Sequence, residues 1–169
     1  YLDGRVHGYQ CEIETSSRKW AGGIYDEARR GWLYPLTRNP KGQDAFTNGR
    51  WNSYRIEAIG NILKTFVNGI QASNLVDDMT AKGFIAFQVH SISSPEDEGK
   101  KVQWKNIRIL TTALDKNRMM ETNKAPQISY LENQLTEEEK RLGFRLLWDG
   151  KTTKGWRGVK KMVFPDQGW

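Results

Sequence analysis

Residues 54–75 read YRIEAIGNILKTFVNGIQASNL, and this stretch decides the fold class. Its first five residues alternate apolar and polar side chains, which is the period-two pattern of a strand with one buried face. A turn at Gly60-Asn61 leads into a second strand over residues 62–67. The following Asn68-Gly69 pair predicts a two-residue hairpin, because a type I′ turn needs positive φ at both central positions. Residues 70–75 then form the returning strand of an antiparallel sheet.

Strand patterns continue on both sides of this stretch. Residues 9–14 alternate apolar and polar side chains, residues 84–90 form an apolar-rich run after Gly83, and residues 102–110 close the series. A polar loop over residues 91–101 joins the last two. Short strands separated by turn signals at this rhythm predict an all-β fold, an antiparallel β-sandwich.

Other intervals carry different signals. Residues 21–50 are rich in glycine and proline but include four aromatic residues, so we expect an ordered loop that packs beside a site. Residues 113–134 are polar and predict a linker or a strap. Thr136 and Glu139 have the spacing of a capping box, which predicts one short helix near the C-terminal segment. Residues 144–148 predict a further strand that ends in a turn at Asp149-Gly150.

Composition and charge exclude several classes of protein. The 169 residues include 26 Lys and Arg against 20 Asp and Glu, a formal net charge of +6. The basic residues are scattered, whereas nucleic-acid-binding proteins concentrate them on one face or helix, so we expect no nucleic-acid partner. No apolar run approaches the roughly 20 residues of a membrane-spanning helix. We therefore expect no transmembrane segment in this stretch.

Cys11 is the only cysteine, which excludes an internal disulfide and a zinc site built on several thiolates. The simplest interpretation is a small buried apolar side chain. A nucleophilic cysteine would need a basic partner such as His7, but four residues along a strand separate the two by roughly 13 Å. Direct activation of the thiol by His7 is excluded at that distance.

Several motifs together resemble the bacterial 3-keto-disaccharide hydrolase family, formerly the domain of unknown function 1080. They occur in the family's order and cover most of residues 1–110: HGYQCEI (7–13), GGIY (22–25), GRWN (49–52) with RIEA (55–58), VNG (67–69), GFIAFQVH (83–90) and WKNIRI (104–109). The resemblance implies a concanavalin A-like jelly roll, which agrees with the predicted sandwich. It also implies a carbohydrate-active enzyme in the periplasm or cell envelope, with an oligosaccharide or glycoside as substrate.

A second resemblance concerns the end of the chain. Residues 135–158 resemble the beginning of a module of the same family, whereas the chain from Tyr1 onward resembles its middle and end. We therefore expect residues 1–112 to be the C-terminal part of a jelly-roll module, residues 113–134 a linker or strap, and residues 135–169 the start of a second module. Alternatively, the last segment completes the first sheet, within the chain or by strand exchange in a homo-oligomer.

Strand alternation selects the candidate site residues. If Tyr9, Cys11 and Ile13 point to the core, the residues between them point to the other face, and the same phase applies to residues 84–90. In a jelly roll the second face is commonly the concave surface that binds sugars. The residues that this places in a site are Gln10, Glu12, Gln88 and His90, joined by Arg108 and Trp104 from the last strand and by Tyr25, Trp32, Glu27 and Arg29 from the long loop. For each of them a structural or surface role is the competing interpretation.

The candidate residues suit elimination from a 3-keto sugar. A ketone at C3 acidifies the hydrogen on C2, so a base removes it and the C1 substituent leaves by β-elimination, after which water can add back. We expect His90 and Glu12 to be catalytic, and Arg108 to stabilise the developing enolate. Glu12 and His90 are also the candidates for a divalent metal ion. The sequence lacks the Glu-x-Asp-x-x-Glu pattern of glucanases with this fold, which argues against ordinary glycoside hydrolysis.

Two other functions stay open at this point. The same fold serves non-catalytic carbohydrate-binding modules, which need Trp, Asn and Gln but no converging titratable groups. A structural module of a surface protein would have no cleft at all. Hydrolase and lyase outcomes of the elimination are not distinguished by the sequence.

Overall fold

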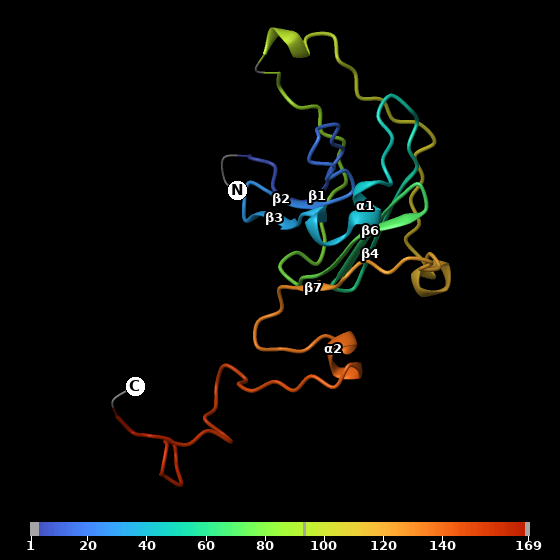
Figure 1. Ribbon diagram of the computed structural model, residues 1–169. Coiled ribbons are helices and arrows are strands. Elements are labelled where there is room, and N and C mark those ends of the chain that lie inside the picture. Colours follow the sequence, from blue (N-terminus) through green and yellow to red (C-terminus); the bar gives the residue numbers. More distant parts are fainter. Residues whose placement is uncertain (1–3, 93, 168–169) are drawn as a thin grey trace.

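The computed structural model of the protein describes residues 4–92 and 94–167, and it is nearly all β (Figure 1). Two sheets form its body. The first, here called sheet A, has the strand order β1-β2-β3, and the second, sheet B, has the order β4-β5-β6-β7. The strands are β1 (Gly8–Cys11), β2 (Ile24–Glu27), β3 (Gly31–Tyr34), β4 (Tyr54–Ile59), β5 (Ile62–Val67), β6 (Ile70–Val76) and β7 (Ile128–Ser129). The helices are short: η1 (Leu36–Arg38), α1 (Pro40–Gln43), η2 (Pro95–Asp97), η3 (Leu114–Asn117) and α2 (Glu137–Arg141).

Sheet B confirms the strands predicted around the Asn68-Gly69 turn. β4, β5 and β6 are antiparallel, and β5 and β6 meet at a turn in which Asn68 has φ 50° and Gly69 has φ 83°. Both values are positive, as a type I′ turn requires. The short β7 then pairs in parallel with the end of β6.

Sheet A corrects the prediction of a long loop over residues 21–50. This interval contains the β2–β3 hairpin, η1 and α1. The period-two pattern did not identify this hairpin, because Asp26 occupies an inward-facing position of β2. Asp26 is fully buried there and forms ion pairs with Arg29 and Arg30. A buried carboxylate with two guanidinium partners takes a position where the pattern expects an apolar side chain.

The core lies between the two sheets. Ile24, Leu33 and Tyr34 of sheet A pack with residues of β5 and β6, among them Ala72 and Leu75. This face-to-face packing of two sheets confirms the predicted all-β class and is that of a β-sandwich of the jelly-roll type.

Residues 111–134 cross one face of sheet B, where they contact Glu57, Lys64 and Asn74, which are paired neighbours on β4, β5 and β6. Glu57 accepts a hydrogen bond from the backbone N–H of Met119, and Lys64 forms an ion pair with Glu121. Tyr34 donates a hydrogen bond of 2.6 Å to the carbonyl of Pro126. The contact with Met119 explains why Glu57, on β4, is buried although its side chain is acidic.

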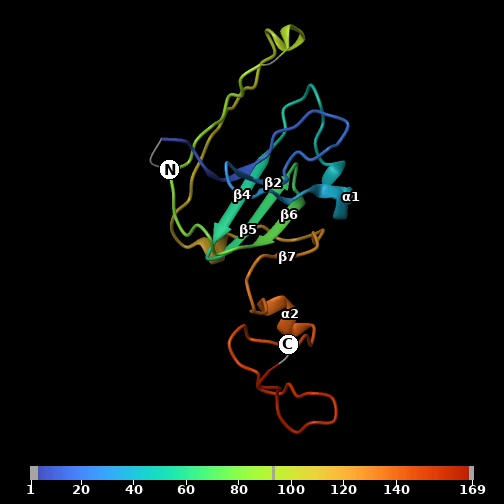
Figure 2. The same ribbon diagram turned by 90° about the vertical axis from the view of Figure 1, so that its left-hand side faces the viewer.

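The predicted strands over residues 84–90 and 102–110 are wrong for this structure, in which both segments have no regular secondary structure. The two segments form an arm that projects beyond the sheets, at the end of the molecule opposite the C-terminal segment (Figures 1 and 2). Phe87 and Trp104 contact one another in this arm, with ring centroids 5.3 Å apart. A strand requires a hydrogen-bonded neighbour, and neither sheet extends to the arm, so Ile85 and Val89 remain 73% and 77% exposed.

The C-terminal segment begins with the predicted helix. Thr136 caps α2, and Glu139 reaches back to the N–H of Thr136 at 2.7 Å, which confirms the capping box. The chain then leads away from the sandwich (Figure 2). Residues 144–148 are exposed and do not form the predicted strand. Among the helices that the structure describes, none is long and apolar enough to cross a membrane.

Candidate functional site

One face of sheet A carries a row of polar and aromatic side chains. Gln10 of β1 lies opposite Tyr25 of β2, and Tyr25 lies beside Trp32 of β3. Residues paired in this way project to the same side of a sheet. Glu12, two residues after Gln10, continues the row, and the Gln10 amide donates a hydrogen bond of 3.2 Å to Glu12 Oε2. The structure therefore brings together four of the residues predicted for the site.

The backbone holds Glu12 in position just after β1 ends. Its N–H donates to the carbonyl of Gly23 at 3.0 Å, and its carbonyl accepts from the N–H of Gly22 at 2.8 Å. The Tyr54 hydroxyl of sheet B lies 3.5 Å from the same carbonyl. On the other side of β1, Tyr9 packs against the core. The predicted phase of β1 is correct up to Glu12, whereas Ile13 is exposed.

The surroundings of Glu12 favour its protonated form. Burial raises the pKa of the Glu12 carboxyl, and the neighbouring charge of Glu14 raises the pKa further. Arg18 and His90 oppose this effect through their positive charge. A carboxyl with a raised pKa that is still close to two basic groups is suited to accept and return a proton.

Arg18 is a part of this site that the sequence interpretation missed. Its guanidinium lies 4.4 Å from the ring centroid of Trp20 and 5.0 Å from that of Trp32. Its Nε donates a hydrogen bond of 2.9 Å to Glu14, which lies four residues earlier. The two Trp rings meet edge to face at 4.8 Å and form an aromatic wall with Tyr25. No signal in the sequence identifies Arg18, because it lies in an irregular loop after β1.

His90 lies in the projecting arm and not on a strand. It is exposed, and its Nδ1 lies 2.9 Å from the carbonyl oxygen of Ser91. It is nevertheless near enough to Glu12 to lower the pKa of that carboxyl. Gln88 is exposed too, and no hydrogen bond or ion pair joins it to Gln10 or Glu12 in the part of the chain that the structure describes. Of the four polar residues predicted to cluster, Gln10 and Glu12 are hydrogen-bonded to one another, and His90 acts on Glu12 through its charge. Gln88 is not joined to them.

The other predicted residues lie farther along the arm, on the opposite face of sheet A, or, in the case of Glu27, on the same face beyond Tyr25. Arg108 is exposed and outside any strand. Trp104 is half-buried against Phe87, so its ring is partly covered by an apolar neighbour. Arg29 is bound to Asp26 on the inner side of sheet A, while Glu27 follows Tyr25 on the outer face of β2.

The site has two further groups to consider, the Cys11 thiol as a nucleophile and the side chains that could bind a metal ion. Burial raises the pKa of the Cys11 thiol to about 12, so the thiol stays protonated and unreactive at neutral pH. Within residues 4–92 and 94–167, no group of three or more His, Cys, Asp or Glu side chains is arranged to hold a metal ion. Glu12 and His90 are the two potential ligands near the site.

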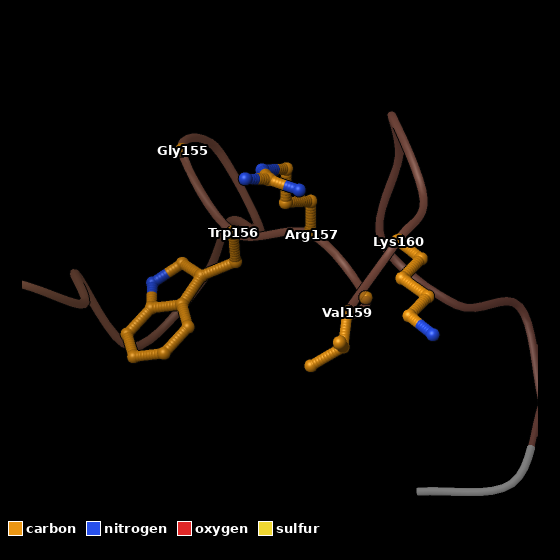
Figure 3. Close-up of a pocket in the computed structure, with 6 residues that line it drawn as sticks. Gly155, Trp156, Arg157, Val159 and Lys160 are labelled. Atoms are coloured by element: carbon orange, nitrogen blue, oxygen red, sulfur yellow. The ribbon is translucent and has the colours of Figure 1, made fainter.

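A shallow hollow of about 380 Å³ lies in the C-terminal segment, far along the chain from Glu12. It is lined by one continuous run, residues 155–160, and the side chains of Trp156 and Arg157 point in different directions (Figure 3). A hollow formed by a single exposed loop, without a carboxylate, offers no arrangement for acid–base chemistry.

Comparisons with known proteins assign the domain. No curated protein matches the sequence. Residues 2–110 match the 3-keto-alpha-glucoside-1,2-lyase-like domain. This interval contains both sheets except β7, and it contains Gln10, Glu12, Arg18 and His90. A carbohydrate-related role follows. Because the match spans more than half of the 169 residues, the protein belongs to the family of 3-keto-alpha-glucoside-1,2-lyase-like domains.

Proposed function

We propose that the protein cleaves 3-keto-glycosides by removing the proton on C2 and eliminating the substituent on C1, with Glu12 as the base. The observation that carries this proposal is the half-buried Glu12 carboxyl, whose pKa is raised by burial and whose Oε2 is fixed by Gln10. Membership of a 3-keto-glycoside family supplies the substrate class.

In the first step, Glu12 takes the proton from C2. The electron pair of the C2–H bond forms a C2–C3 double bond, and the C3 carbonyl becomes an enolate oxygen. This step needs a ketone, because only the carbonyl makes the C2 hydrogen acidic. The raised pKa of Glu12 brings the carboxylate closer in basicity to the group it must deprotonate.

In the second step, the enolate returns its electrons. The C3 carbonyl re-forms, a C1–C2 double bond forms, and the C1–O bond to the aglycone breaks. His90 in its imidazolium form donates a proton to the departing oxygen, a role supported by its closeness to Glu12. A lyase releases the resulting enone. A hydrolase adds water to C1 while Glu12 returns the proton to C2.

The His90→Ala variant tests this assignment. With a 3-keto-glucoside whose aglycone is a simple alcohol, we expect the variant to lose about 10²- to 10⁴-fold in rate, the usual contribution of a general acid. Its far-ultraviolet circular dichroism should match the wild type, because the exposed imidazole contributes little packing. The corresponding glucoside without the ketone should be a poor substrate for both proteins. Cleavage of the plain glucoside at an equal rate would rule out the elimination.

A carbohydrate-binding module is the second candidate, and the aromatic wall favours it. Trp20, Tyr25 and Trp32 form a wall of aromatic rings, the side-chain type on which sugar rings stack, with Arg18 lying over Trp20 and Trp32. Titration calorimetry with 3-keto and plain glucosides separates the two functions. Binding of either sugar with no conversion of the keto form would replace the enzyme by a binding module.

A further inference from the structure

We propose that Arg18 binds the enolate oxygen at C3 of the substrate, and that Glu14 and the Trp20–Trp32 pair position it for this task. The inference rests on the proposed function and adds a group to it, since Glu12 then holds the proton from C2 and His90 is assigned to the departing oxygen at C1, which leaves the enolate oxygen at C3 without a partner. An enolate requires a nearby hydrogen-bond donor or positive charge.

The first argument is the position of Arg18. Its guanidinium stacks over Trp32, and Trp32 belongs to the same face of sheet A as Tyr25 and Gln10. Arg18 is also close enough to Glu12 to act on that carboxyl through its charge. A sugar held between the aromatic wall and Glu12 would therefore have the guanidinium beside it.

The second argument is the way in which Arg18 is held. Glu14 binds only Nε, at 2.9 Å, and the guanidinium carbon lies 4.4 Å from the ring centroid of Trp20 and 5.0 Å from that of Trp32. In the described residues no hydrogen bond involves Nη1 or Nη2, and the side chain is 47% exposed. Two terminal nitrogens with four N–H groups thus remain available in a fixed plane.

The third argument is the partner itself. The Glu14 side chain is only 11% exposed, and its second oxygen, Oε2, is buried without a hydrogen-bond partner among the described residues. A pair that served stability alone would gain from a bidentate contact. The single contact through Nε instead leaves the outer side of the guanidinium turned away from Glu14.

The competing cation is Arg108, which was predicted from the sequence for the same task. It provides a matched control because it is also exposed and lies in the family domain, yet it has no stacking partner or ion pair among the described residues. The experiment therefore compares Arg18→Ala, Arg18→Lys and Arg108→Ala in the full chain.

The test uses p-nitrophenyl 3-ketoglucoside, whose leaving group departs without a proton. We expect Arg18→Ala to lower kcat about 10²- to 10³-fold with a smaller change in KM, which is the usual effect of removing one oxyanion-binding group. Arg18→Lys should lose less, and Arg108→Ala should keep the wild-type rate. His90→Ala should lose much less with this leaving group than with an alcohol aglycone, whereas Arg18→Ala should lose a similar factor with both, so the roles of Arg18 and His90 are separated.

Two further measurements distinguish binding of the enolate from a structural role. Exchange of the C2 hydrogen with deuterated solvent, followed by nuclear magnetic resonance, should slow in Arg18→Ala by a similar factor. Added guanidinium ion at millimolar concentration should restore part of the rate in Arg18→Ala but not in Glu12→Gln. Conversion by the wild type with full activity in Arg18→Ala would overturn this inference alone, whereas a wild type that converts no keto-glucoside would overturn the proposed function as well.

Discussion

The amide of Gln10 donates a hydrogen bond of 3.2 Å to Oε2 of Glu12, the next side chain on the same face of the extended chain. This contact fixes one oxygen of the carboxylate. Gln10 is the only side chain among the described residues that is hydrogen-bonded to this carboxylate, and the backbone N–H of Ile13 is its other donor. Glu12 is thus oriented and partly desolvated before any sugar arrives, which is the arrangement that a general base requires.

Replacing Glu12 with Gln should remove the base and preserve the shape of the side chain. We expect kcat for a 3-keto-glucoside to fall about 10²- to 10⁴-fold. Exchange of the C2 hydrogen with solvent should fall in parallel, because it depends on the same proton transfer. Steady-state kinetics and nuclear magnetic resonance measure the two quantities.

Glu27→Gln is the control for this change. Glu27 lies on the same sheet at the other end of β2, opposite Gly8, and is half-buried like Glu12. It should cost much less than Glu12→Gln, because Glu27 is not the proposed base and has no hydrogen bond or ion pair to Gln10 or Glu12 among the described residues. Equal losses in both variants would mean that charge on the sheet, and not a base at Glu12, controls the rate.

The raised pKa of Glu12 predicts the pH dependence of the reaction. The base must be ionised, so kcat/KM should fall as the pH drops through a pKa above the ordinary 4.5 of a glutamate. Glu14→Gln removes a neighbouring negative charge and should move this acidic limb to lower pH. Arg18→Ala removes a positive charge and should move the limb to higher pH. A limb that stays in place in both variants would show that another group titrates.

The sequence pattern correctly predicted the elements that are stabilised by residues close to them in the chain. The Asn68-Gly69 turn, the strands beside it and the Thr136–Glu139 capping box depend on neighbouring residues and appear as expected. The alternation of β1 likewise placed Gln10 and Glu12 on one face. These features need no information about the rest of the chain.

Features that depend on distant partners could not be predicted in this way. The β2–β3 hairpin contains the buried carboxylate of Asp26, which is tolerated there only because Arg29 and Arg30 form ion pairs with it. The apolar alternation of residues 84–90 indicates a strand, but a strand forms only beside another strand, and neither sheet extends to this segment. Arg18 reaches Trp32 through the fold of an irregular loop, so its place in the site follows from tertiary structure alone.

Asp77 should contribute to stability through a buried network that links the two sheets. It lies just after β6, accepts hydrogen bonds from Tyr9 of β1 and forms an ion pair of 2.7 Å with Arg30. Asp77→Asn should lower the free energy of unfolding by about 3 kcal/mol, the lower end of the cost of breaking a buried pair, because Arg30 keeps Asp26 as a partner. The exposed neighbour Asp78 gives the control variant Asp78→Asn, which should change little. Urea unfolding followed by tryptophan fluorescence measures both.

The same residue should make stability depend on pH. Burial works against ionisation of Asp77, but hydrogen bonds from Arg30, Tyr9 and the Met79 N–H outweigh it and lower the pKa below the ordinary 3.8. A lowered pKa in the folded state means that its contribution is present above pH 3.8 and is lost as the pH falls through the folded-state value. The Asp77→Asn variant should lack this part of the acid-induced loss. An identical acid profile in both proteins would contradict the assignment.

Gly22 should be the glycine that tolerates substitution least, because its position limits both the backbone and the space around it. It has φ +88°, and a Cβ there would lie 2.7 Å from Ala72 Cβ and 2.7 Å from Val67 Cγ2. Gly49→Ala isolates the backbone contribution, since Gly49 has φ +70° and no atom within 4 Å of the added Cβ. We expect Gly49→Ala to cost about 1–2 kcal/mol from the left-handed backbone alone. Gly22→Ala should cost roughly 1–3 kcal/mol more, because the new methyl group must displace packed side chains between the sheets. It should also lower activity, since the Gly22 N–H holds the carbonyl of Glu12 at 2.8 Å. Equal unfolding free energies for the two variants would show that sheet A and sheet B do not meet at Gly22 as closely as the structure places them.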